Sequence, residues 1–127
     1  MDRTPRGELT IQTLAMPLNT NANGDIFGGW IVSQMDLAAG VLAKRIAQGR
    51  VATIAIHSMT FLKPVQVGDL VSCHVELVKQ GNSSMTIAVE VWALPARHND
   101  RYPVTEGIFV FVAIDEQGKP RQVTKIE

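Results

Sequence analysis

The sequence predicts an α+β domain in which a curved, antiparallel five-stranded sheet wraps around one long central helix. Three observations lead to this fold class. One stretch of about twenty residues has helical periodicity, five stretches have the pattern of strands, and the helical stretch is too apolar to lie exposed. A chain of 127 residues has the usual length of one domain, so we expect residues 1–127 to form a single unit.

Each element follows from a local pattern. Residues 8–16, ELTIQTLAM, alternate polar and apolar side chains and predict a first strand, which Pro17 closes. The helix is expected over residues 29–48, where large apolar side chains recur near helical spacing and Gly49 provides a stop. Four further strands, separated by Gly, Pro and Asn turns, are expected at 52–62, 69–79, 84–94 and 104–114. The last strand contains IFVFVAI, which is apolar on both faces and suits a central strand or one covered by another subunit.

Composition excludes several functional classes. Twelve basic and twelve acidic residues cancel, so no overall field favours nucleic acid or a membrane surface. No run approaches the ~18 apolar residues of a membrane span, and MDRTPRGELT lacks the apolar core of a secretory signal. The lone Cys73 and the three scattered histidines have no zinc-binding spacing. We therefore expect a cytoplasmic protein with no metal, no nucleic-acid partner and no membrane insertion.

One acid in the predicted helix stands out. Asp36 is the only acid between Asp25 and Asp69, and its neighbours at helical spacing are small or apolar. An aspartate on a solvated outer face is one interpretation. A carboxylate in a partly apolar cleft, suited to base catalysis, is the other. The helical pattern alone leaves both open.

The loop before the helix, NTNANGDIFGGW at residues 19–30, also has two interpretations. Its asparagines, aspartate and paired glycines are ordinary turn formers. Alternatively, Gly28 and Gly29 let a substrate carbonyl reach the free N–H groups at the helix N-terminus, where the helix dipole favours an oxyanion. Composition alone favours the turn interpretation.

Four segments, taken together, resemble the YciA-type acyl-CoA thioesterases of the hotdog superfamily. They are TNANGDIFGGWIVSQMD (20–36), SMTFLKPVQVGD (58–69), GNSS (81–84) and VEVW (89–92), and the similarity extends from about Gly7 to Arg121. The resemblance implies a hotdog fold. It also implies hydrolysis of acyl-CoA thioesters, of short to medium chain and broad specificity, to free acid and CoA. No cofactor is expected beyond the CoA that belongs to substrate and product.

The resemblance further implies roles for individual residues. Asp36 matches the family's helix acid, the expected general base or nucleophile, and Asn21 matches a loop asparagine that orients the thioester or the attacking water. Gly28 and Gly29 match the glycines at the start of the helix, whose backbone N–H groups polarise the thioester carbonyl. In related enzymes the loop and the helix acid meet across a dimer interface, so we expect Asn21 of one protomer to serve Asp36 of another.

Coenzyme A carries phosphates, so its binding requires local basic groups and N–H donors even at zero net charge. The GNSS turn and the GKPR tail occupy places where the resembled family contacts the nucleotide, and FLKPV adds a further lysine. Each of these cations can equally be a solvated surface charge. The residues expected to bind CoA are Asn23, Lys63, Gly81, Asn82, Ser83, Ser84, Lys119 and Arg121.

Rival functions differ in which residues they need. A non-catalytic acyl-CoA sensor or carrier on the same fold would keep the GNSS turn and the basic residues but would not need Asp36. A hydratase of acyl thioesters would pair an acid with a histidine, and no histidine lies near the loop or the predicted helix in the sequence. Exposed sheet edges and the apolar last strand predict at least a dimer. The resemblance implies a hexamer built as a trimer of dimers.

Overall fold

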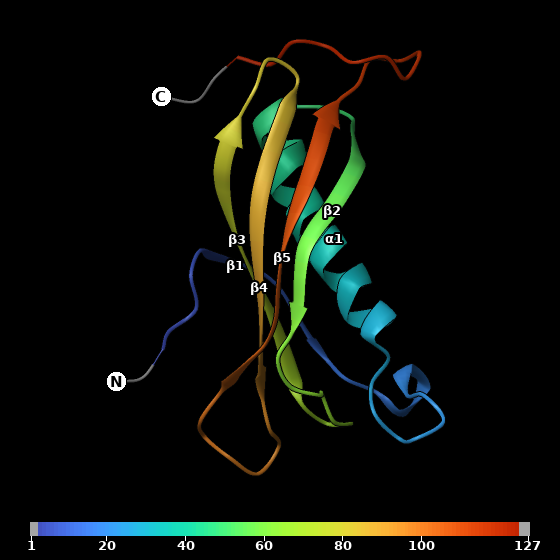
Figure 1. Cartoon of the computed structure of the whole chain (residues 1–127), viewed down its shortest axis with the longest axis vertical. Coiled ribbons are helices and arrows are strands. Elements are labelled where there is room, and N and C mark those ends of the chain that lie inside the picture. Colours follow the sequence, from blue (N-terminus) through green and yellow to red (C-terminus); the bar gives the residue numbers. More distant parts are fainter. Residues whose placement is uncertain (1–2, 125–127) are drawn as a thin grey trace.

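The computed structural model describes residues 3–124, which form one five-stranded antiparallel sheet curled around one long helix (Figure 1). The helix α1 is preceded by strand β1 (Glu8–Leu14) and the short 3-10 helix η1 (Pro17–Asn19), and it spans Gly28–Ala47. The remaining strands are β2 (Val51–Phe61), β3 (Leu70–Gln80), β4 (Ser84–Leu94) and β5 (Tyr102–Ala113). The predicted fold class is confirmed, and every predicted element agrees with the observed one to within two residues.

The strands lie in the order β1-β3-β4-β5-β2, and every neighbouring pair is antiparallel. β5 therefore pairs on both sides, which confirms the central position that its apolar faces predicted. β1 and β2 are the two edge strands. Because β2 joins the far edge of the sheet from β1, α1 connects the two edges and lies along one face of the sheet (Figure 1).

The core lies between α1 and the alternate, inward-facing residues of the sheet. The helix presents Ile31, Met35 and a row of alanines to the strands, and these side chains are almost fully buried. Small residues allow the helix backbone to approach the sheet closely. At Gly40, for example, an added Cβ would lie 3.7 Å from the ring of Phe111, which is ordinary contact distance.

The two ends of α1 are finished differently. At the N-terminus Phe27 is the capping residue, and its side chain makes no capping hydrogen bond. At the C-terminus Gln48 adopts a left-handed conformation with φ 53°. There Arg121 donates a hydrogen bond to the Ala47 carbonyl at 2.9 Å, which occupies one of the unpaired carbonyls that every helix leaves at its end. The N-terminus of α1 therefore has no side-chain cap, whereas a carbonyl at its C-terminus is hydrogen-bonded to Arg121.

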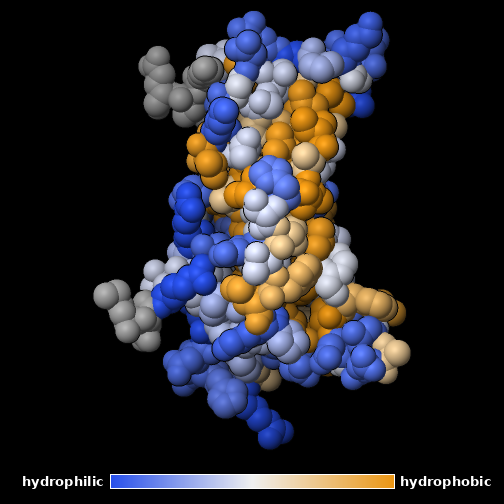
Figure 2. Space-filling view, in the orientation of Figure 1, coloured by the Kyte–Doolittle hydropathy of each residue, from blue (hydrophilic) through white to orange (hydrophobic). Residues whose placement is uncertain are grey.

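Apolar side chains remain exposed where α1 adjoins the edge strand β2. Leu37 and Ile54 are 58% and 59% exposed, and Val41 and Ile56 are also exposed. Figure 2 shows apolar residues gathered along the side of the molecule on which β2 and α1 lie. We call these four residues the α1–β2 face. Among residues 3–124, no helix combines the length and the apolar character that crossing a bilayer would need.

Candidate active site

The Asp36 carboxylate is held in place by a residue of the edge strand. Thr53 Oγ1 donates a hydrogen bond to Asp36 Oδ1 at 2.7 Å. Thr53 pairs with Phe111 of β5, whose ring is buried against the helix, and paired residues of neighbouring strands point to the same side of a sheet. The Thr53 side chain therefore points towards α1, where it meets Asp36.

The contact leaves Asp36 with one oxygen fixed and the other available. Asp36 is half-buried, and within residues 3–124 its Oδ2 has no hydrogen-bond partner. A carboxylate of this kind can accept a proton from water or attack an electrophilic carbon itself. Asp36 lies beside the exposed Leu37 and is itself half-buried, which is compatible with either interpretation of this residue. Sequence reasoning missed Thr53, because the alternation of the strand alone does not show that this side chain faces α1.

Asn21 shapes the loop that precedes the helix. Its Oδ1 accepts hydrogen bonds from the backbone N–H of Asn23 at 2.8 Å and of Asp25 at 3.1 Å. Both lone pairs of the amide oxygen are thereby used, so the side chain can offer a ligand only its Nδ2 donor. Such a donor suits a carbonyl or water oxygen. Asn23 is exposed, and its side chain has no hydrogen-bond partner in the described part of the chain.

Gly28 and Gly29 form the exposed first positions of α1. The first intrahelical bonds run from Trp30 N and Ile31 N to the Phe27 carbonyl, so the N–H groups of the two glycines precede them. Neither glycine has a positive φ, and a Cβ at Gly29 would meet nothing within 4 Å. Nothing within the protomer thus requires glycine at position 29, whereas a ligand approaching the open helix end would benefit from the missing side chain. Unpaired N–H groups at a helix N-terminus are a ready site for an oxyanion.

The GNSS turn and the segment after β5 meet at the C-terminal end of α1. The carbonyl of Asn82 accepts a hydrogen bond from Val123 N at 2.8 Å, and Ser83 O accepts one from Ala113 N at 2.8 Å. The other two turn residues, Gly81 and Ser84, bond each other through Gly81 N and Ser84 O at 2.9 Å. These backbone contacts give the turn a fixed shape.

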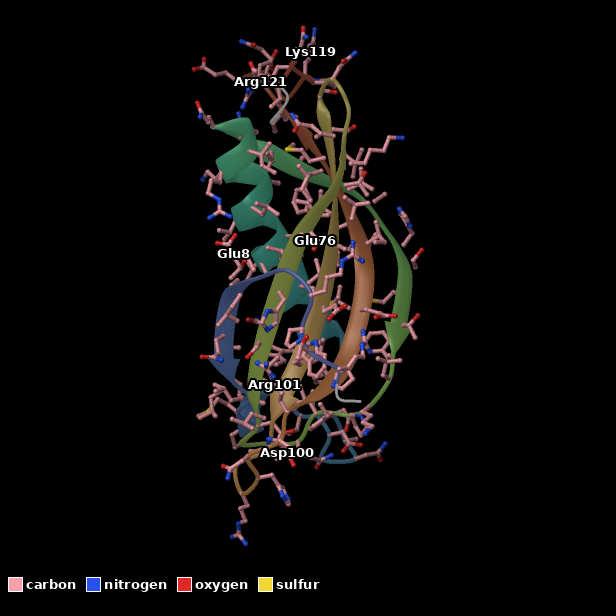
Figure 3. The ribbon with its side chains drawn as sticks, turned by 90° about the vertical axis from the view of Figure 1, so that its left-hand side faces the viewer. Glu8, Glu76, Asp100, Arg101, Lys119 and Arg121 are labelled. Atoms are coloured by element: carbon pink, nitrogen blue, oxygen red, sulfur yellow. The ribbon has the colours of Figure 1, made fainter. Side chains whose placement is uncertain are left out.

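Figure 3 shows Lys119 and Arg121 together at this end of the molecule. Lys119 is exposed. The Arg121 guanidinium is partly buried and donates to Ala47 O at 2.9 Å and Ile114 O at 3.2 Å, so part of its donor capacity serves the fold. No local sequence pattern indicates this structural role.

Lys63 lies at the opposite end. Its Nζ is 5.5 Å from the centre of the Tyr102 ring, and Figure 3 shows the neighbouring Arg101 at the end away from Lys119. The 20 residues of α1 separate the two ends by about 30 Å, at ~1.5 Å per residue. The residues predicted to bind CoA therefore form two groups, of which only Lys63 and Asn23 lie at the end where α1 begins.

Comparisons with known proteins were made for both the sequence and the structure. The model of the thioesterase superfamily matches residues 23–97. The acyl-CoA thioester hydrolase YciA of Salmonella typhimurium is 54% identical over 124 residues, covering 95% of this chain and 93% of the relative.

Two solved structures are similarly close. The hexameric thioesterase y2039 from Yersinia pestis is 54% identical with a TM-score of 0.91, covering 97% of this chain and 100% of that one. HI0827, a hexameric broad specificity acyl-coenzyme A thioesterase, was solved as a variant with an aspartate replaced by alanine. It is 50% identical with a TM-score of 0.91, and the match covers 94% of this chain and 88% of that one.

Proposed function

The chain belongs to the thioesterase superfamily, among its YciA-type acyl-CoA thioester hydrolases, and on this premise we propose how it hydrolyses acyl-CoA thioesters to free acid and CoA. In this proposal Asp36 is the general base and the N–H groups of Gly28 and Gly29 stabilise the oxyanion. The observation that carries it is the Asp36 carboxylate, with Oδ1 held by Thr53 at 2.7 Å and Oδ2 open. The aspartate-to-alanine variant of HI0827 draws attention to one aspartate of that enzyme.

The reaction then has two steps. Asp36 takes a proton from water, and the resulting hydroxide attacks the thioester carbonyl to give a tetrahedral oxyanion, which the helix N–H groups bind. Collapse of this intermediate breaks the carbon–sulfur bond, and the proton held by Asp36 passes to the departing CoA thiolate. Asn21 Nδ2 orients the thioester or the water. Direct attack by Asp36, which would leave the acyl group on its carboxylate, is the competing route, and mass spectrometry of a rapidly quenched reaction checks for that adduct.

We propose that the site is shared between two copies of the chain. Gly29 and Asp36 are seven residues apart on one helix, or about 10 Å along its axis. A water molecule that attacks a carbonyl must lie about 3 Å from both the base and the reacting carbon. The donors of one protomer and the carboxylate of another can satisfy this requirement without being constrained by the spacing of about 10 Å along one helix.

The α1–β2 face supports such an assembly. It exposes Leu37, Val41, Ile54 and Ile56 directly beside Asp36, and an exposed apolar patch on an edge strand favours association. Because y2039 and HI0827 are hexameric, we propose that this chain is also a homo-oligomer, at least a dimer and in its full assembly a trimer of dimers.

Substrate binding is proposed at both ends of the molecule. Lys63 and Asn23 would bind CoA near the thioester, and the GNSS turn with Lys119 would bind a nucleotide at the other end. Arg121 has donors left after its two carbonyl contacts and is the weaker of the two tail candidates. HI0827 has broad specificity, which favours a range of acyl chains here as well.

Thiol release from acyl-CoA substrates of different chain length tests the proposal. Asp36→Asn and Asp36→Ala should each lower kcat by about 10²–10⁴-fold, the usual contribution of a general base. Asp100→Asn, which changes an exposed aspartate in the connection between β4 and β5, is the matched control and should retain parental turnover. Turnover of the Asp36 variants within a few-fold of the parent would refute the role of Asp36. Tight acyl-CoA binding by a parent protein that releases no thiol would instead indicate a sensor or carrier.

A further inference from the structure

The connection between β2 and β3, residues 62–69, is joined by hydrogen bonds to the loop that begins α1. Ile26 N donates to the Val65 carbonyl at 3.1 Å, and both residues are buried. Gln66 Nε2 donates to Asp25 Oδ1 at 3.1 Å. These contacts fall three residues or fewer before Gly28, so they bear directly on where the helix starts.

The same connection is anchored on its other side by a buried carboxylate. Asp69 is 4% exposed, and its Oδ2 accepts from Gln66 N at 3.0 Å and from the Tyr102 hydroxyl at 2.9 Å. The Tyr102 hydroxyl also lies 3.0 Å from the Pro64 carbonyl. Burial, followed by the hydrogen bond to Asp69, raises the pKa of Tyr102, so its hydroxyl stays protonated and remains a donor.

A continuous path of contacts therefore leads from the sheet to the proposed site. Tyr102 at the start of β5 holds Asp69, and Asp69 fixes the backbone of Gln66. The Gln66 side chain then holds Asp25, whose backbone N–H is the second donor to Asn21 Oδ1. A change in the direction of the Asp25 side chain would thus be transmitted to Asn21.

We propose that Gln66 is a positioning residue for the thioester hydrolysis: held by Asp69, it fixes Asp25 and thereby places Asn21 and the N–H groups of Gly28 and Gly29. The inference rests on the proposed function, because it assigns those groups a task. It assigns Gln66, within the KPVQVGD segment (residues 63–69), a positioning role that is separate from CoA binding and from packing of the core. Gln66 itself is exposed, so its side chain is not needed to fill the core.

The first test removes the side-chain contact. Gln66→Ala should lower kcat by about tenfold with little change in KM, because small misplacements of catalytic groups cost up to ~10²-fold in rate. Gln12→Ala is the matched control, since Gln12 is an exposed glutamine that donates to Ser72 Oγ at 2.9 Å on the far edge of the sheet. The control should retain parental kcat, and both variants should unfold at the parental temperature.

The second test exchanges donor and acceptor. Gln66→Glu alone places two carboxylates opposite each other and should lower kcat at least as much as Gln66→Ala. The double variant Gln66→Glu/Asp25→Asn restores one donor facing one acceptor and should recover kcat to within about threefold of the parent. A role confined to general stability predicts no such recovery of kcat.

Hydrogen exchange at the amides of residues 21–29 supplies a readout that does not depend on activity. Exchange should be faster in Gln66→Ala, unchanged in Gln12→Ala and restored in the double variant. An active parent whose Gln66 variants keep kcat within twofold, or whose exchange is unchanged, overturns the positioning role alone. A parent with no thioesterase activity overturns the proposed function, and the exchange pattern still decides whether Gln66 holds the loop.

Discussion

At the scale of single residues, the proposed chemistry depends on how Asp36 is held. An aspartate side chain on a helix surface has several rotamers, and only some would point Oδ2 towards a bound water. The 2.7 Å hydrogen bond from Thr53 selects one of them and leaves Oδ2 open. Hydrogen bonds to a charged acceptor are typically worth ~1.5–3 kcal/mol, enough to hold a carboxylate in one orientation.

Substitution of Thr53 should therefore affect catalysis more than substrate binding. Thr53→Val keeps the shape of the side chain but removes the donor, and we expect kcat to fall by about tenfold with KM nearly unchanged. Thr53→Ser keeps the hydroxyl and should retain most of the parental kcat. Initial-rate measurements of thiol release with both variants check this, and parental kcat in Thr53→Val would show that the hydrogen bond to Asp36 is not needed.

At the scale of elements, the sequence predicted the helix and all five strands because each is encoded by local periodicity and turn residues. The site was only partly predictable, because its contacts join distant positions. Asp36 and Thr53 are 17 residues apart, and their contact depends on the register of β2 against β5, including the irregularity between Thr53 and Ala55. Asn21, Gly28 and Gly29 could be singled out only from a motif, since their composition is that of an ordinary turn.

Arg121 shows the same limit at the end of the helix. In the sequence it is one of several cations in a polar tail, and its contact with Ala47 spans 74 positions. No local pattern indicates that this guanidinium closes the C-terminus of α1. The prediction of a phosphate-binding role for Arg121 followed from resemblance, whereas its structural role follows from geometry.

Arg121→Ala should accordingly destabilise the protein. It removes the donors to Ala47 O and Ile114 O, and we expect the free energy of unfolding to fall by about 1–3 kcal/mol. Lys119→Ala, a change of an exposed cation two residues away, should stay within about 0.5 kcal/mol of the parent. Denaturant unfolding of both variants measures the difference, and equal stability of the two would mean that the helix end does not need the guanidinium.

At the scale of the whole molecule, the face of the sheet away from α1 contains a histidine that links stability to pH. His74 is 7% exposed, and within residues 3–124 its Nε2 has no hydrogen-bond partner. Burial lowers the pKa of His74 below its ordinary 6.5, with a further lowering by Arg101 against opposing contributions from the Gly7 backbone and Glu90. The folded protein therefore binds fewer protons than the unfolded chain near that pH.

Stability should decrease as the pH falls from about 7.5 through the ordinary imidazole value to about 5, because protons then bind preferentially to the unfolded state. In His74→Gln this part of the pH dependence should be absent, although other groups still contribute. Denaturant midpoints of the two proteins across this range provide the measurement. Parallel curves for the parent and His74→Gln would contradict the assignment.

The arrangement of the whole assembly decides whether the proposed site lies within one chain or between two. Co-expression of differently tagged Asp36→Asn and Asn21→Asp chains, followed by purification through both tags, gives hybrids with each defect on a separate copy. Asn21→Asp keeps an acceptor for the two loop N–H groups, replaces the Nδ2 donor by an oxygen and adds a negative charge. If Asn21 of one copy serves Asp36 of its neighbour, one site of each hybrid dimer is intact and about half of the parental turnover should remain.

The decisive control places both substitutions on the same chain and pairs it with an unchanged copy. In a site shared between copies, both sites of this second hybrid contain one defect, so turnover should be close to that of the inactive single variants. A site confined to one chain predicts the opposite result for each hybrid. The second hybrid then keeps about half of the parental turnover, because its unchanged copy has an intact site. The first hybrid is nearly inactive, because each of its copies has a defective site. Gly29 and Asp36 are about 10 Å apart along one helix, and a site shared between copies can bring the donors and the carboxylate closer than this spacing allows. The two hybrids measured by thiol release therefore decide whether Asn21 and Asp36 act from one chain or from two.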